Sequence, residues 1–78
     1  MTKEDLIKVI ANALEIDSKK LNHNSTSSNT KNWDSIGHLS ILMSLDRKFD
    51  GKISNISSLA KADSIEKIFT ELKKNKLI

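Results

Sequence analysis

The 78-residue sequence contains no cysteine, no proline, two glycines, one tryptophan and two phenylalanines. Without cysteine the chain cannot form a disulfide, a thiolate metal site or a catalytic thiol. The lack of proline and the scarcity of glycine argue against a β-sandwich or barrel, because those folds need turn residues every ~8–12 positions. No apolar run approaches the ~20 residues of a membrane span. The acidic N-terminus is also unlike a signal peptide. We therefore expect one domain, residues 1–78, in the cytoplasm.

The apolar residues that are present recur at helical spacing. They predict helices at about residues 3–16, 35–49, 56–61 and 64–74, separated by a long polar loop over 17–33. This pattern indicates an all-α fold, a small four-helix bundle with three main helices and one short helix. Two starts have the spacing of a capping box, and one glycine is suited to end the second helix. These residues are Thr2 with Asp5, Asp63 with Glu66, and Gly51.

The second predicted helix has an unusually wide apolar arc. One face carries Leu39, Leu42, Leu45 and Phe49, extended by Ile36 and Met43, while Ile41 lies toward the other side. The arc is about twice the width of the usual ~100° stripe. The helix is therefore either the central one or in contact with something outside the chain.

The net charge of +3 is spread along the sequence, and its only local basic cluster is Lys73-Lys74-Asn75-Lys76. A basic composition can indicate contact with nucleic acid or a membrane surface. One hypothesis is therefore a small basic helical module that binds nucleic acid or a partner helix. The dispersed charge favours a solvated lysine-rich surface instead, because a nucleic-acid binder would concentrate its charge on one face.

The sequence lacks the residue patterns needed for metal binding, nucleotide binding and serine hydrolysis. His23, His38 and the scattered carboxylates do not have metal-ligand spacing, so no metal site is expected. The absence of a glycine-rich loop excludes a nucleotide phosphate cradle. Ser35 and His38 are close enough on a helix to interact, but no Gly-x-Ser-x-Gly elbow accompanies them. The chain is therefore expected not to be an enzyme.

The dipeptide Asp34-Ser35 offers chemistry that needs no pocket. Asp34 is the expected N-cap of the second helix, which makes Ser35 the first helical residue with its hydroxyl facing solvent. A phosphate ester on that hydroxyl would lie in the favourable field of the helix dipole. The alternative is that both residues only cap the helix.

The sequence around this serine resembles a known family signature. The run is Asn32-Trp33-Asp34-Ser35-Ile36-Gly37-His38-Leu39. It is similar to the Asp-Ser-Leu motif of acyl and peptidyl carrier proteins, and its flanks resemble the Trp-Asp-Ser-Leu-Gly-His-Leu variant of stand-alone carriers. The resemblance extends over nearly the whole chain, through its length, helix pattern and long first loop.

The resemblance implies a covalent 4′-phosphopantetheine on Ser35, added by a phosphopantetheinyl transferase that uses coenzyme A and magnesium. The arm would hold acyl or aminoacyl groups as thioesters, and Asp34 would support Ser35. The expected partner surface comprises Ile36, His38, Met43 and Arg47. The core expected from the resemblance comprises Leu6, Ile10, Leu39, Leu42, Leu45, Phe49, Ile65 and Phe69.

The second helix departs from the strongly acidic helix of fatty-acid carriers, because it carries Arg47 and Lys48 and has Asp46 as its main acid. Like charges across an interface reduce association rates. The hypothesis is therefore a monomeric carrier for a dedicated pathway, in which a ligase loads one acyl or amino acid and an acyltransferase delivers it. No nucleic acid and no membrane span are expected.

Overall fold

A computed structural model describes all 78 residues, and it is entirely helical apart from loops. The elements are α1 (Lys3–Leu14), η1 (Ser18–Lys20), α2 (Ser35–Lys48), η2 (Lys52–Asn55), η3 (Ser57–Lys61) and α3 (Ile65–Lys74), where η denotes a 3₁₀-helix. The all-α class is confirmed. The four-helix bundle is not, because only three α-helices are present and the predicted helix at 56–61 is the 3₁₀-helix η3. Serine and asparagine are frequent over 52–61, and their side chains favour turns over α-helix.

The helix starts follow the predicted caps in part. Thr2 and Asp5 form the predicted capping box, with the Thr2 amide donating to Asp5 Oδ2 at 2.9 Å. The prediction for α3 was wrong by one residue, because Ser64 is the N-cap and its hydroxyl accepts from the Lys67 amide at 3.1 Å. Asp63 accepts instead from the Lys67 ammonium at 2.9 Å.

The ends of the long helices lie slightly before the predicted ones. α1 ends at Leu14 rather than at residue 16, because Glu15 adopts a left-handed conformation with φ 59°. α2 ends at Lys48, and Phe49 is its C-cap. Gly51 has the left-handed φ of 81° expected of a residue that follows a helix.

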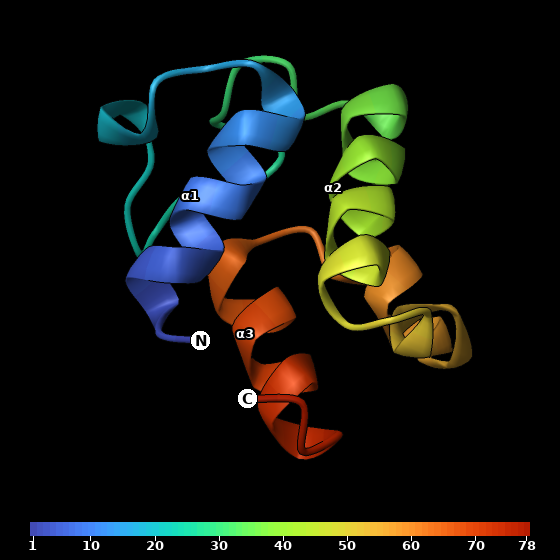
Figure 1. The fold of residues 1–78 in the computed structure, drawn as a ribbon. Coiled ribbons are helices and arrows are strands. Elements are labelled where there is room, and N and C mark those ends of the chain that lie inside the picture. The colour runs from blue at the N-terminus through green and yellow to red at the C-terminus, as the bar shows by residue number, and fades with distance from the viewer.

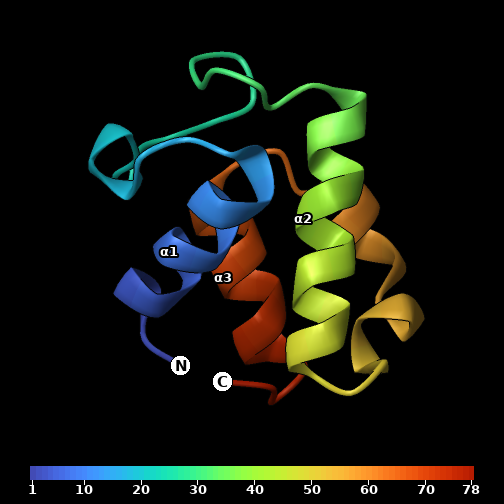
Figure 2. The same cartoon turned by 45° about the horizontal axis from the view of Figure 1, so that its top comes forward.

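α2 lies between two parts of the molecule. α1 is on one side and the 3₁₀-helices η2 and η3 are on the other, as both views show (Figures 1 and 2). Figure 2 also shows that the start of α2 is at the opposite end of the molecule from the two chain termini. This arrangement leaves an outward strip of α2 with no element covering it.

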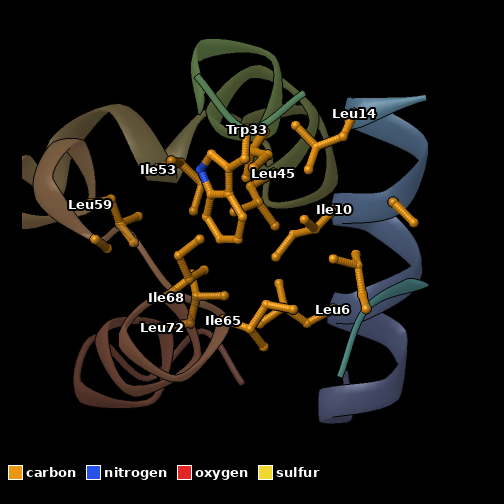
Figure 3. Close-up of a cluster of buried hydrophobic side chains, with 14 residues drawn as sticks. Leu6, Ile10, Leu14, Trp33, Leu45, Ile53, Leu59, Ile65, Ile68 and Leu72 are labelled. Atoms are coloured by element: carbon orange, nitrogen blue, oxygen red, sulfur yellow. The ribbon is translucent and has the colours of Figure 1, made fainter. Parts of the chain in front are cut away.

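The core collects apolar side chains from every element except η1 (Figure 3). Its members are Leu6, Ile10, Ala11, Leu14, Leu21, Trp33, Ile41, Leu45, Ile53, Leu59, Ala62, Ile65, Ile68 and Leu72. Leu42, Phe49 and Phe69 pack against it while partly exposed. The placement of Leu39 in the core was wrong, because its side chain is 57 % exposed and Ile41 is fully buried instead. The buried stripe of α2 follows an i, i+4, i+8 row through Gly37, Ile41 and Leu45.

The long loop between α1 and α2 is held to the core at its two apolar residues, Leu21 and Trp33, both of which are buried. It also contacts the start of α3, where the Ser25 carbonyl accepts from the Ile65 amide at 3.1 Å. The Ser27 amide donates to the Asp63 carbonyl at 2.8 Å. These bonds fix the path of the loop toward the start of α2.

Candidate functional site at the start of helix α2

Ser35 is the first residue of α2, and its side chain is exposed. Asp34 is the N-cap, and its Oδ1 accepts from the Gly37 amide at 2.8 Å. The amides of Ser35 and Ile36 have no intrahelical acceptor at this position. No acidic residue occupies the first turn of α2, whereas α1 carries Glu4 and Asp5 there. The Ser35 hydroxyl therefore lies at an electropositive helix end.

A close backbone approach fixes the first turn of α2 in place. A Cβ added to Gly37 would collide with the carbonyl oxygen of Asn32 and would lie 2.9 Å from Leu14 Cδ2. The Asn32 side chain donates to the Leu14 carbonyl at the end of α1, at 2.9 Å. Glycine at position 37 is therefore required by packing, although its helix propensity is low.

His38 links the start of α2 to both neighbouring segments. The Trp33 indole N–H donates to His38 Nδ1 at 3.1 Å, and His38 Nε2 lies 2.9 Å from the Leu59 carbonyl oxygen in η3. Since the indole N–H can only donate and the carbonyl can only accept, these two contacts suit the tautomer with a proton on Nε2 and none on Nδ1. The Trp33 and His38 rings are nearly parallel, with centroids 6.3 Å apart.

His38 is consequently half-buried, and both ring nitrogens are occupied within the chain. This differs from the surface position expected for a partner-binding residue. Its geometry instead holds η3 and Trp33 against α2, one turn below Ser35.

An exposed apolar strip continues down α2 from the serine. Ile36, Leu39 and Met43 are 77 %, 57 % and 56 % exposed, and their i, i+3, i+7 spacing places them on one face. Arg47 follows one turn after Met43 and is also exposed. We call these four residues the α2 outer strip. Of the predicted partner residues, the structure thus brings Ile36, Met43 and Arg47 together on one surface.

One hollow adjoins this strip at Met43 and a second lies beside Ser35, whereas Arg47 and Lys48 line a separate groove with Val9 and Asn12 of α1. The first, of about 310 Å³, lies between α2 and the 3₁₀-helices and is mostly apolar; its lining includes Leu42, Met43, Ile53, Ile56 and Leu59. The second, of about 410 Å³, is mainly polar and lies beside the serine; its lining includes Ser35, Asp34, His38, Lys61 and Asp63. The pKa of Asp63 is held below its usual value by the hydrogen bond from the Lys67 ammonium. A phosphate attached to Ser35 would meet free amides and Lys61, with the carboxylates of Asp34 and Asp63 lining the same hollow.

The sequence pattern located Asp34, Ser35 and the apolar residues of the strip, but it missed Asn32 and Lys61. Asn32 has a left-handed φ of 68°, a conformation that asparagine tolerates better than most residues. An asparagine that tolerates a positive φ, followed five residues later by a glycine in a helix, was the sequence signal for this close approach. Lys61 reaches the hollow through tertiary packing of η3, which no local pattern records.

The structure contains no group of three or more His, Cys, Asp or Glu side chains arranged to hold a metal ion. None of its helices combines the length and hydrophobicity needed to cross a bilayer. No protein-family model, curated protein or solved structure matches the chain.

Proposed function

We propose that the chain is a carrier protein that is modified on Ser35 by 4′-phosphopantetheine. The observation that carries this proposal is the exposed Ser35 hydroxyl at the electropositive, acid-free first turn of α2, adjoining a polar hollow and an apolar strip. The residues around Ser35 fit 4′-phosphopantetheine. The hydroxyl can form the phosphate ester, and the Ser35 and Ile36 amides with Lys61 can offset its negative charge. When bound, the arm supplies a thiol that holds an acyl or aminoacyl group.

The chain's own residues have positioning roles in this proposal. Asp34 caps α2 and thereby holds the first turn that carries Ser35. Gly37 and Asn32 hold the first turn against α1, so the modified position is presented at the end of the molecule away from both termini. The chain acts as a substrate of other enzymes rather than as a catalyst.

The α2 outer strip is the proposed docking surface for those enzymes, which are the transferase with coenzyme A and magnesium, a ligase, and an acyltransferase. The apolar hollow beside Met43 is suited to shelter a short acyl chain. We place this carrier in the cytoplasm, as a monomer.

Modification of Ser35 is tested by intact-mass measurement. The purified chain is incubated with a broad-specificity phosphopantetheinyl transferase, coenzyme A and magnesium. We expect the mass to rise by one phosphopantetheine group. Ser35→Ala should abolish the gain, and Ser40→Ala, five residues along the same helix, should leave it unchanged. No gain in the native chain, combined with salt-sensitive binding of DNA or RNA, would support the small basic interaction module instead.

A dedicated pathway is proposed because Arg47 and Lys48 are both exposed at the end of α2. Fatty-acid carriers present acids there to basic enzymes, so charge reversal should bring this chain closer to them. We expect Arg47→Glu with Lys48→Glu to accelerate loading or elongation by general fatty-acid enzymes. Unchanged or slower rates would remove the reason for a separate pathway.

A further inference from the structure

The segment from α2 to η3 carries cations without ion-pair partners. Residues 35–61 contain two carboxylates and four cations, which are Arg47, Lys48, Lys52 and Lys61. All four cations are exposed. The two ion pairs of the chain, Lys3–Glu66 and Lys67–Asp63, lie elsewhere. Lys61 shares its hollow with the carboxylates Asp34 and Asp63, whereas Arg47 and Lys48 line a groove beside Val9 and Asn12 of α1 that contains no acid. The unneutralised positive charge is therefore at the end of α2.

The two carboxylates near the end of α2 do little to offset the charge of Arg47 and Lys48. Asp46 is half-buried, and its Oδ1 accepts from the Ser54 amide of η2 at 3.3 Å. Asp50 lies in the turn after α2, beyond the last turn that carries Arg47 and Lys48. The end of the outer strip is thus cationic, about 6 Å along the helix from Met43.

Apolar and cationic features meet on this one surface. The convex strip of Ile36, Leu39 and Met43 adjoins the apolar hollow of about 310 Å³, and Met43 belongs to both. Exposed apolar side chains that gather in this way indicate a contact surface. The rim of a protein interface is polar, and complementary charge there sets the association rate and the choice of partner.

We propose that the partner is a protein whose docking surface is apolar at its centre and acidic at its rim. The apolar centre would cover Ile36, Leu39 and Met43, and its carboxylates would face Arg47 and Lys48 in the last turn of α2. This inference rests on the proposed function, because it specifies the chemistry of the enzymes that such a carrier must meet. It predicts the opposite charge arrangement from that of an acidic carrier with basic enzymes.

The same observations disfavour other occupants. A second copy of the chain would bring no carboxylate of the α2 outer strip to pair with Arg47 and Lys48, because that strip contains no acid. A nucleic-acid strand would need aromatic side chains for stacking, and the only tryptophan is buried in the core. The apolar strip has no role against a phosphate backbone, which is recognised by charge.

Two synthetic amphipathic helical peptides provide the test. Both have the same leucine-rich face; one carries glutamate along its flanks and the other carries lysine. Binding is measured from amide chemical shifts of the unmodified ¹⁵N-labelled chain. We expect the glutamate peptide to shift the amide signals of the α2 outer strip and of η3. Its binding should weaken as the salt concentration is raised. The lysine peptide should not bind.

Variants then separate the two contributions. Arg47→Glu with Lys48→Glu should weaken the binding of the glutamate peptide about tenfold. Lys19→Glu with Lys20→Glu, the same change in charge on the exposed η1, should have little effect. Leu39→Ser with Met43→Ser should also abolish binding, because the apolar centre is lost. The side chains of all three pairs are exposed, so the fold should persist in each variant. Unchanged amide chemical shifts in the rest of the chain would show this.

Three results would overturn the inference. They are equal binding of the two peptides, equal effects of the two charge reversals, and binding of a DNA duplex or of phosphatidylglycerol vesicles in place of the glutamate peptide. Peptide binding does not involve the Ser35 hydroxyl. A chain that gains the phosphopantetheine mass yet fails this test remains a carrier with a different partner surface. A chain that passes it without the mass gain has the surface but not the proposed function.

Discussion

The inner and outer faces of α2 use apolar side chains for different purposes. On the inner face Ile41 and Leu45 are fully buried against the rest of the core, and on the outer face Ile36, Leu39 and Met43 are mostly exposed. By contrast, α3 leaves no large apolar side chain exposed, because Ile65, Ile68 and Leu72 are buried and Phe69 is partly covered. The wide apolar arc of α2 therefore consists of a structural half and a half that is available for binding.

The largest expected effect separates these halves directly. Ile41→Ala should lower the free energy of unfolding by about 3 kcal/mol, because it removes buried methyl groups and leaves a cavity. Leu39→Ala should change it by less than about 0.5 kcal/mol. Urea denaturation of both variants measures the difference. Equal losses would show that the outer face is structural as well.

The tip of the inner face is tested at Gly37. Gly37→Ala should lower the free energy of unfolding by about 2–3 kcal/mol, because the added methyl group has no space between Asn32 and Leu14. Helix propensity alone would make the same change stabilising. Gly51→Ala is the matched control, since open space surrounds that position and only its positive φ opposes a side chain. A stabilised Gly37→Ala variant would contradict the packing described here.

The edge between the two faces is tested at His38. His38→Leu should cost about 1–2 kcal/mol, because it removes the acceptor of the buried Trp33 indole N–H and the contact to the Leu59 carbonyl. The exposed His23 provides the control as His23→Leu, which should be nearly neutral. Thermal unfolding and tryptophan fluorescence measure both. Unchanged stability in His38→Leu would place His38 among the surface residues.

The smallest expected effect concerns the capping box at the start of α1. The pKa of Asp5 is lowered, mainly by the hydrogen bond from the Thr2 backbone amide and then by that with the Thr2 side chain. A depressed pKa in the folded state adds stability above the ordinary aspartate pKa of about 3.9, and that stability is lost as the pH falls through the lowered pKa.

Asp5→Ala should therefore reduce stability slightly at pH 7 and have less effect at pH 2. Denaturation at both pH values, with the exposed Glu4→Ala as control, measures this difference. An equal loss at both pH values would assign the role of Asp5 to helix propensity rather than to the capping box.

The sequence was sufficient for the features that depend on local spacing. The three α-helices, the Thr2 capping box, the Asp34 cap and the anchoring of the loop by Leu21 and Trp33 were all predicted. Local spacing could not decide which half of the wide apolar arc on α2 faces the core, so Leu39 was placed inside in error.

Tertiary contacts explain the remaining differences. His38 was expected at the surface because a polar residue on a helix usually lies there, whereas its partners come from η3 and from the loop. Likewise, the bonds from the loop to Ile65 and Asp63 join residues that are far apart in sequence. Neither set of contacts leaves a mark in the local pattern.

The most direct test of the account is the mass of the chain recovered from its own organism, with the peptide that contains residue 35 sequenced by fragmentation. The account predicts phosphopantetheine on Ser35, bearing a thiol or a thioester-linked group. An unmodified serine under every growth condition, in cells that contain an active phosphopantetheinyl transferase, would contradict it.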